Sequence, residues 1–573
     1  MQRTLTSENI AQLERRVDVA TGEEDLQVVL FELGFRSTRA ARRLEARVRQ
    51  LLGSAGASPS INPQRQPQHV FPGVETWVQE RPRAPTHLAR PAERDEYPPT
   101  AEQSKAIDAF LTGGSLKIAA FAGAGKTSTL KMIARRHAGR GLYLAFNKKI
   151  AREARGAFPQ RVDCRTTHSL AMNSVGRQHG FSRSKMFDPV NALKLAAMMK
   201  LEAMRIGAIE IPATHQAYLI QTTIKRFCQS DAEAPLPSHV PKSLRLAGLE
   251  ESARVHMQAW VLAQAEALWR RMVNANDEIP LGHDGYLKLW SLGRPRLACE
   301  YVLLDEAQDS NACVLSVLTA QNAQIVYVGD RHQQIYEWRG AVNAMAKIGT
   351  DLETTLTQSF RFGPEIAAEA TRILSRLGEA NALQGNASIR SEIGSAIETD
   401  AVLARTNAMV ITETLAALDR GRLPFIVGGT DELEEMVRDV YRLMDGQPGL
   451  HPDFFGFKNW TEVVSFANSD EGEGLRAFVS LVLQNGPGVL WTAIQRSADE
   501  ESSANISIST AHKAKGCEWD SVRLATDFTT DANDDIGLAD EESRLFYVAI
   551  TRAKRVLSVD PATLAAFTNS PQF

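Results

Sequence analysis

The sequence has few cysteines and no long apolar run. Its 573 residues include five cysteines, and no two share a CxxC spacing, which argues against a zinc knuckle or a disulfide framework. Nothing in their placement indicates an iron–sulfur cluster. The first residues are polar, so no signal peptide is indicated, and no stretch is long enough to cross a bilayer. We therefore expect a cytoplasmic protein with no membrane partner.

A strong net charge is also absent. The formal charge is −3, with 43% hydrophobic and 23% charged residues. A protein that is basic over its whole surface is therefore excluded, and any nucleic-acid contact must be confined to a local patch. No short-period repeat is visible. The length is sufficient for three or more globular domains.

The N-terminal part differs in composition from the rest of the chain. Helical spacing of apolar residues predicts a helical extension over residues 1–53, whose second helix is rich in arginine. Its basic face is either solvated surface or a patch that contacts nucleic acid or a protein partner. Residues 54–97 are rich in proline, which predicts an extended linker.

After this linker, short apolar strands alternate with helical segments, which predicts parallel sheets with helices on both faces. We expect an α/β fold of two tandem lobes. The first lobe covers residues 98–350 and contains a mostly helical insertion at about 170–285. The second covers residues 351–573 and contains a smaller insertion at about 431–499.

A glycine loop between a predicted strand and a predicted helix has the form of a phosphate-binding P-loop. Its glycines let backbone N–H groups turn toward phosphate, Lys126 places a charge on the β- and γ-phosphate oxygens, and the Thr127 hydroxyl can bind Mg²⁺. The first motif position is Ala120 rather than glycine, a mild departure. The residues expected to surround the phosphates are Ala122, Gly123, Ala124, Gly125, Lys126, Thr127 and Ser128.

Two carboxylates follow the apolar run Tyr301–Leu304. Asp305 is expected to hold Mg²⁺ directly or through water, and Glu306 to polarise the attacking water as general base. Such a pair alone is a weak signal, but with the P-loop it predicts an ATPase or GTPase.

Further motifs indicate which kind of nucleotide hydrolase this is. Together they resemble the UvrD/Rep-like branch of superfamily 1 DNA helicases over about residues 98–557. The sequences of several motifs are similar to those of the F-box DNA helicase subgroup. No F-box is visible, so recruitment to a ubiquitin ligase is not expected. The motifs that carry the resemblance are Pro99–Gln103, the P-loop, Asp305–Asp309, Gly329–Ala341, Gln358–Arg361, Thr510–Trp519 and Arg544–Lys554, with His283–Lys288 adding to the likeness to the subgroup.

The resemblance implies two RecA-like motor lobes with ATP and Mg²⁺ between them. Gln103 resembles the glutamine that reads adenine, since an amide can both donate to and accept from the base edge. Phe360 stands where the family often has a tyrosine that stacks on adenine, and Glu518 resembles a residue near the ribose. As a plain surface residue, Gln103 would simply begin a helix.

Three further residues resemble the family's catalytic side chains. Gln333 is similar to the glutamine that senses the γ-phosphate. Arg361 and Arg552 resemble two arginine fingers, whose guanidinium forks suit a transferring phosphoryl group and whose effect can reach ~10³–10⁵ in rate. Both come from the second lobe, so hydrolysis would require the lobes to close. Otherwise Gln333 would be a loop amide and the arginines surface charges.

Single strands bind through backbone charge and base stacking. Trp338 resembles the family's base-stacking tryptophan, although a tryptophan is also often a core residue. The other candidates have structural or solvated-surface alternatives, and none is expected to read sequence. The residues expected to contact the strand are Phe146, Asn147, His168, Trp338, Arg339, His512 and Lys513.

The resemblance therefore implies an ATP-driven motor on single-stranded DNA and partial duplexes, moving 3′ to 5′, in repair, recombination control or mobile-element defence. Two alternatives remain: a translocase that displaces proteins with little unwinding, and a nucleotide-dependent switch. RNA also remains open as a track.

Overall fold

The computed structural model describes most of the chain after the N-terminal region. The N-terminal unit, residues 1–88, is separate from residues 89–573. The predicted helical extension and linker lie almost entirely outside the described residues. The described residues are 97–568, without 189, 207–208, 242–249, 337–343, 395–397, 455–456, 470–471 and 529–539, together with Leu13, Val17, Val29, Leu44, Arg47 and Val48, all six of which are helical.

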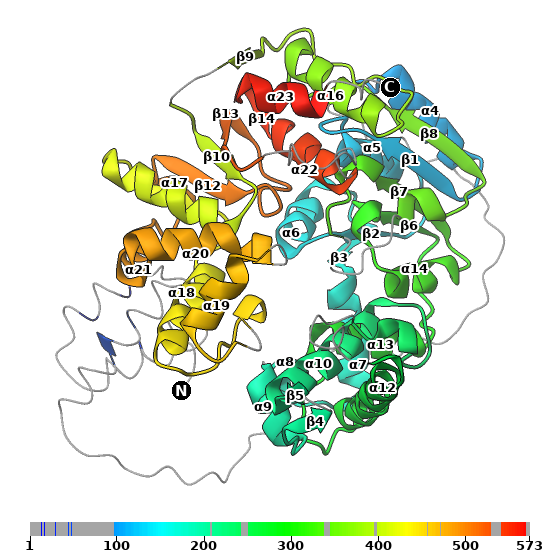
Figure 1. The fold of residues 1–573 in the computed structure, drawn as a ribbon. Helices are drawn as coiled ribbons and strands as arrows, with labels where there is room; N and C mark the ends of the chain where they lie inside the picture. The colour runs from blue at the N-terminus through cyan, green and yellow to red at the C-terminus, as the bar shows by residue number, and fades with distance from the viewer. Residues whose placement is uncertain are drawn as a thin grey trace. The chain divides into compact units, whose positions relative to one another are not determined.

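The first lobe is built on a parallel six-stranded sheet, in the order β3-β2-β6-β7-β1-β8 (Figure 1). All residues of β2 and β6 are buried, as expected for parallel strands covered on both faces. The strands are β1 (Leu116–Ala120), β2 (Gly141–Ala145), β3 (Val162–Thr166), β6 (Tyr301–Leu304), β7 (Gln324–Gly329) and β8 (Leu352–Leu356). The helices of this lobe are α4 (Ala101–Leu111), α5 (Lys126–Arg136), α6 (Lys148–Ala157), α14 (Ala312–Thr319) and α15 (Ala344–Lys347).

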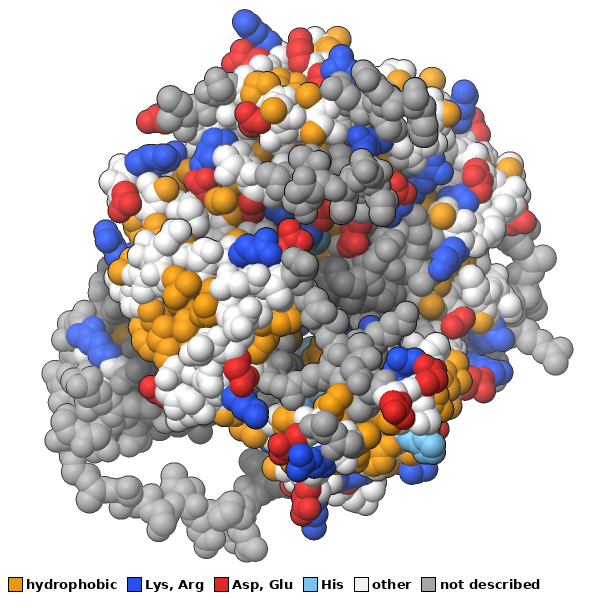
Figure 2. Space-filling view, in the orientation of Figure 1, with side chains coloured by type: hydrophobic (Ala, Val, Ile, Leu, Met, Phe, Trp, Pro, Cys, Tyr) orange, Lys and Arg blue, Asp and Glu red, His pale blue; other side chains and the backbone are white. Residues whose placement is uncertain are grey.

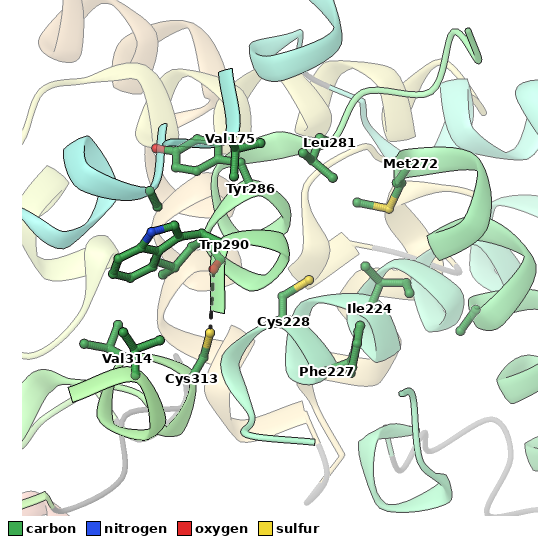
Figure 3. Close-up of a cluster of buried hydrophobic side chains, with 14 of the residues drawn as sticks. Val175, Ile224, Phe227, Cys228, Met272, Leu281, Tyr286, Trp290, Cys313 and Val314 are labelled. Atoms are coloured by element: carbon green, nitrogen blue, oxygen red, sulfur yellow. Dashed lines mark hydrogen bonds between the residues drawn. The ribbon is translucent and has the colours of Figure 1, made fainter. Parts of the chain in front are cut away.

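Between β3 and β6 lies a mostly helical insertion. It also contains an antiparallel hairpin, β4 and β5, that the sequence patterns did not predict. Its apolar core is continuous with one face of the first sheet, and Figure 3 shows Tyr286 and Trp290 of α13 among its side chains. The elements are α7 (Thr167–His179), α8 (Arg183–Phe187), α9 (Ala192–Met198), β4 (Met204–Ile206), β5 (Ile209–Ile211), α10 (Ala213–Gln229), α12 (Glu251–Val273) and α13 (Gly282–Leu292).

A second parallel six-stranded sheet forms the second lobe, in the order β11-β12-β10-β13-β14-β9. The two sheets confirm the predicted tandem RecA-like α/β lobes. The strands are β9 (Glu392–Gly394), β10 (Ala401–Ala404), β11 (Pro424–Ile426), β12 (Ile506–Thr510), β13 (Trp519–Leu524) and β14 (Ala553–Ser558). The helices are α16 (Pro364–Arg376), α17 (Asn407–Asp419), α22 (Asp540–Ile550) and α23 (Pro561–Thr568).

Four helices, α18 (Asp431–Met444), α19 (Trp460–Ala467), α20 (Glu473–Asn485) and α21 (Pro487–Gln495), occupy the second insertion. They share a core with one face of the second sheet. Figure 2 shows hydrophobic side chains gathered over this region. Among the described residues no single helix has the length and apolar character to span a membrane; the bent pair α20 and α21 meets that test jointly, across an angle of 97°.

One strand lies in a different lobe from the one predicted. The second lobe was expected to begin at residue 351, but β8 pairs in parallel with β1 of the first sheet. A short strand has the same local pattern in either sheet, so only this long-range pairing decides its place. The lobes also share a core, because Phe121 and Ala122 after β1 pack among residues of the second lobe.

Candidate nucleotide site and strand groove

The P-loop joins β1 to α5 at the carboxyl edge of the first sheet. Gly123 and Gly125 have φ of 72° and 75°, a left-handed conformation that glycine adopts without strain. A Cβ on Gly123 would collide with Ser359 Oγ and lie 2.8 Å from Arg361 Cβ, so a side chain at Gly123 would also meet the segment that leads into the second lobe. The Phe360 N–H donates to Gly123 O at 2.8 Å. The loop and this segment are therefore in direct contact.

A cavity of about 330 Å³ brings most of the predicted nucleotide residues together. Its lining combines backbone N–H groups at a helix N-terminus with one lysine and one arginine, which suits a polyphosphate. The residues that line it are Gly123, Ala124, Gly125, Lys126, Thr127, Ser128, Glu306, Phe360, Arg361 and Glu518.

Asp305 and Thr127 have the geometry expected of a magnesium site beside a phosphate. Thr127 Oγ1 donates to Asp305 Oδ2 at 2.8 Å, and the Tyr143 hydroxyl donates to the same oxygen at 2.7 Å. Burial and the adjacent Glu306 raise the pKa of Asp305, so a cation would favour its ionised form. The described residues contain no cluster of three or more His, Cys, Asp or Glu side chains that could bind a metal, but Mg²⁺ needs only one or two carboxylates beside phosphate and water.

Glu306 is held next to the P-loop lysine. Its backbone is left-handed, with φ of 51°, and its carboxylate lies 3.8 Å from Lys126 Nζ and accepts from Gln308 Nε2 at 2.6 Å. Burial opposes its ionisation, but Lys126, Lys515 and Gln308 lower the pKa of Glu306 to about 2. Glu306 is therefore an anion at neutral pH, suited to orient and polarise a water molecule.

Gln103 lies beside the same loop. It forms a capping box with Thr100 at the start of α4, and its Nε2 donates to Thr129 Oγ1 at 3.2 Å. A Cβ on Gly125 would lie 3.2 Å from both Gln103 Nε2 and Phe360 Cε2. The amide and the ring predicted to hold adenine thus converge on Gly125.

Arg361 of the second lobe lines the cavity beside the P-loop, whereas Arg552 is not among the lining residues and donates to Val548 O and Thr551 Oγ1 of its own lobe. Arg361 Nε donates to Glu518 at 2.7 Å, and its Nη1 donates to Thr551 O at 3.0 Å. Arg552 is 2% exposed, and burial together with the charge of Arg361 lowers its pKa to about 9, against the opposing effect of Glu306. Arg552 therefore lies close enough to Arg361 and to the candidate base Glu306 for both charges to shift its pKa.

Gln333 connects the lobes together with Lys515 and Asp309, two residues for which no role was predicted. Lys515 Nζ donates to Asp309 Oδ2 at 2.6 Å and to Gln333 O at 2.5 Å. Burial raises the pKa of Asp309 to about 6 despite this ion pair. Lys515 and Asp309 both lie inside the motifs Thr510–Trp519 and Asp305–Asp309, so these motifs were the sequence signal from which the two residues could have been found.

Tyr547 of α22 makes a second connection that was missed. Its hydroxyl accepts from the Ala122 N–H at 3.1 Å and donates to Asp330 Oδ2 at 3.0 Å. Gln333 Nε2 donates to the same Asp330 oxygen at 2.8 Å. A tyrosine of the second lobe therefore reaches both the P-loop and the segment after β7.

A charged contact involves the two residues that precede Gln333 in the chain. Arg331 Nη2 donates to Glu379 Oε2 at 2.7 Å, and His332 Nε2 lies 3.0 Å from the same oxygen. Burial acts in the opposite direction, but His332, the Asn381 N–H and Arg331 lower the pKa of Glu379 to about 2. The two residues immediately before Gln333 are thus fixed to the segment that follows α16.

The residues predicted to contact a strand divide into groups. Phe146, Asn147 and His168 line one groove, and Asn147 also caps α6 by accepting from the Ile150 N–H at 2.9 Å. The His512 carbonyl accepts from the Tyr336 hydroxyl at 2.9 Å.

Lys513 is not among the residues that line this groove, and its ammonium instead pairs with Glu432 at 2.9 Å. Trp338 and Arg339 lie outside the described residues. Contact with a strand stays a prediction for all seven residues.

This arrangement, a P-loop and an acidic pair on one parallel sheet with arginines from a second, defines a P-loop nucleotide hydrolase of two lobes. Residues 100–348 match the UvrD/REP helicase N-terminal domain, and residues 465–562 match the UvrD-like helicase C-terminal domain. The chain belongs to the UvrD/Rep-like helicases, as the motifs predicted.

Individual relatives agree with this assignment. F-box DNA helicase 1 of Gallus gallus is 30% identical, covering 80% of this chain and 48% of the relative. F-box DNA helicase protein 1 of Schizosaccharomyces pombe is 31% identical, covering 80% of this chain and 57% of the relative. ATP-dependent DNA helicase Rep of Escherichia coli is 27% identical over 42% of this chain and 37% of the relative. The chain thus spans about half the length of the two F-box relatives.

Proposed function

We propose that this chain is an ATP-dependent, Mg²⁺-requiring motor that moves along single-stranded DNA and unwinds partial duplexes in the 3′ to 5′ direction. The observation that carries the proposal is the cavity in which Lys126 of one lobe faces Arg361 of the other. The family assignment and the names of the relatives support DNA as the track. Repair, recombination control or mobile-element defence in the cytoplasm is the proposed setting, and the N-terminal helices are a candidate contact for a protein partner.

The chain's own residues supply the steps. Backbone N–H groups of the P-loop and Lys126 bind the triphosphate, and Gln103 with Phe360 holds the base. Thr127 and Asp305 would hold Mg²⁺, which when bound neutralises charge on the β- and γ-phosphate oxygens. Glu306 orients the attacking water, and its low pKa means that it is already ionised.

Closure of the lobes completes the site. Arg361 and Arg552 stabilise the transferring phosphoryl charge only when the second lobe is docked. The contacts of Tyr547 and Lys515 between the lobes also form only in that docked state. Hydrolysis removes the group that holds the lobes together, so each cycle opens the cleft. The strand-contacting residues lie on both lobes, so opening and closing moves the strand.

Partial duplexes with a 3′ or a 5′ single-stranded tail provide the test. We expect ATP-dependent unwinding of the 3′-tailed substrate only, and ATPase activity that rises strongly with single-stranded DNA and less with RNA. ATPase without strand stimulation would favour a nucleotide switch and contradict the proposal.

A second candidate is a translocase that strips proteins from single strands. The second insertion favours it, because the α-helices in the described part of that insertion are the four short ones α18 to α21, where UvrD-like enzymes carry a larger subdomain. Displacement of a protein block from a single strand, without unwinding of either tailed duplex, would identify this activity.

A further inference from the structure

Asp305, the carboxylate expected to hold Mg²⁺, has a hydrogen-bond donor on a neighbouring strand. The Tyr143 hydroxyl donates to Asp305 Oδ2 at 2.7 Å. Tyr143 lies in the middle of β2, which pairs in parallel with β6 (Figure 1). No role was predicted for Tyr143, and the motifs that carry the family resemblance do not include it.

The pairing of β2 with β6 brings this hydroxyl to the carboxylate. Tyr143 is the register partner of Leu303. Because side chains alternate between the two faces of a strand, the residue two positions after Leu303 lies on the same face as Tyr143. That residue is Asp305, whose N–H donates to Leu144 O at 3.1 Å and keeps this segment paired with β2. The sheet itself therefore aligns the donor with its acceptor.

The ring of Tyr143 is fixed by packing. Tyr143 is 0% exposed, and its ring centroid lies 4.5 Å from that of Phe158. Both residues belong to one apolar core of the first lobe. A phenol keeps its proton at neutral pH, so its hydroxyl donates to a carboxylate. Tyr143 is therefore a donor held in one place.

Both oxygens of the Asp305 carboxylate are hydrogen bonded. Oδ2 also accepts from Thr127 Oγ1 at 2.8 Å, and Oδ1 accepts from the Glu306 N–H at 3.0 Å. Of these three donors, Thr127 is expected to bind the cation itself, and Glu306 is the chain neighbour of Asp305. Tyr143 is thus the donor that ties the carboxylate to the body of the sheet. Fixed partners of this kind set the orientation of side chains that bind metals.

We propose that Tyr143 is a positioning residue, whose hydroxyl holds the Asp305 carboxylate in the orientation that accepts Mg²⁺ beside a bound nucleotide. The inference rests on the proposed function, because it takes a metal–nucleotide complex as the ligand of the site. It adds to that function a residue of β2 that is not among those lining the nucleotide cavity.

Binding of Mn²⁺ to the complex of the full chain with ADP, measured by electron paramagnetic resonance, tests the proposal without hydrolysis. Tyr143→Phe keeps the buried ring and removes only the hydroxyl. We expect the dissociation constant for Mn²⁺ to rise about 10- to 100-fold, the usual cost of losing an outer partner of a metal ligand. Affinity for ADP in EDTA should stay within twofold of wild type, because Tyr143 does not line the nucleotide cavity.

Steady-state ATPase gives a second measurement. The Mg²⁺ concentration for half-maximal activity should rise by the same factor, while kcat recovers at saturating Mg²⁺. Tyr301→Phe is the matched control, because Tyr301 is also 0% exposed and lies at the start of β6, at the opposite end of that strand from Asp305. Loss of its hydroxyl should leave the affinity for Mn²⁺ at the wild-type value.

The outcomes separate the two proposals. Wild-type affinity for Mn²⁺ in Tyr143→Phe would overturn the positioning role and leave the motor proposal intact. A parallel loss of Mn²⁺ affinity, metal-free ADP affinity and urea midpoint would also overturn it, because that pattern indicates a purely structural residue. Failure of the unsubstituted protein to bind ADP would overturn the proposed function itself.

Discussion

Tyr547→Phe removes one hydroxyl that joins the two lobes at the P-loop. That hydroxyl accepts from the Ala122 N–H and donates to the Asp330 carboxylate, and all three residues are at most 1% exposed. Phenylalanine fills the same space, so the substitution removes two hydrogen bonds without opening a cavity. The effect therefore measures how strongly this contact holds the lobes closed.

The magnitude follows from the two bonds. A neutral hydrogen bond contributes ~1 kcal/mol and one to a charged group ~1.5–3 kcal/mol, and a buried donor left without a partner costs a similar amount. The loss is therefore about 2–4 kcal/mol. If this loss falls entirely on lobe closure, strand-stimulated kcat decreases by about 30- to 900-fold, since 1.36 kcal/mol corresponds to a tenfold change in rate.

Steady-state ATPase with saturating single-stranded DNA checks this value. Tyr441→Phe is the control, because Tyr441 lies on α18 and is 44% exposed, and it should change kcat less than twofold. Urea unfolding of both variants shows whether the cost falls on global stability instead. A Tyr547→Phe variant with wild-type kcat and wild-type unfolding free energy would refute the role assigned to the hydroxyl.

Lys126→Ala should abolish ATP turnover and leave the urea midpoint near wild type, since Lys126 contributes charge at the loop rather than core packing; measurable turnover would refute the phosphate site. Glu379→Gln should lower the free energy of unfolding at pH 7 by at most ~3 kcal/mol, because the pKa of Glu379 lies near 2 instead of its ordinary 4.5. This stabilisation is complete above pH 4.5 and is lost as the pH falls through 2, so in urea titrations the variant should depend less on pH over this interval; parallel curves would contradict it. Trp338→Ala should reduce strand-stimulated ATPase more than basal ATPase, whereas equal losses would indicate a packing role.

The local parts of the site could be predicted from the sequence. The P-loop and Asp305-Glu306 are continuous segments whose chemistry depends on neighbours in the chain, and the structure places both at the carboxyl edge of one sheet. Asn147 shows the limit of such predictions, because a residue that follows a β-strand can also begin the next helix. Its side-chain oxygen caps α6, whereas the role predicted for it was contact with the nucleic-acid strand.

Contacts between distant segments could not be predicted. Ala122 and Tyr547 are 425 positions apart, and Asp309 and Lys515 are 206 apart. No local pattern distinguishes a tyrosine in a buried helix from one that reaches the opposite lobe. The lobe of β8 was predicted wrongly for the same reason, since its pairing with β1 cannot be read from its own five residues. The groove beside Phe146 also depends on how α8 and α13 pack against the sheet.

In the proposed mechanism, one lobe holds the triphosphate while arginines from the other act on it. Arg552→Ala tests this mechanism when its nucleotide affinity and its single-turnover hydrolysis in the presence of single-stranded DNA are compared with those of wild type. We expect nucleotide affinity within a few-fold of wild type and hydrolysis slower by ~10³–10⁵. Hydrolysis at the wild-type rate would contradict the claim that the second lobe completes the site.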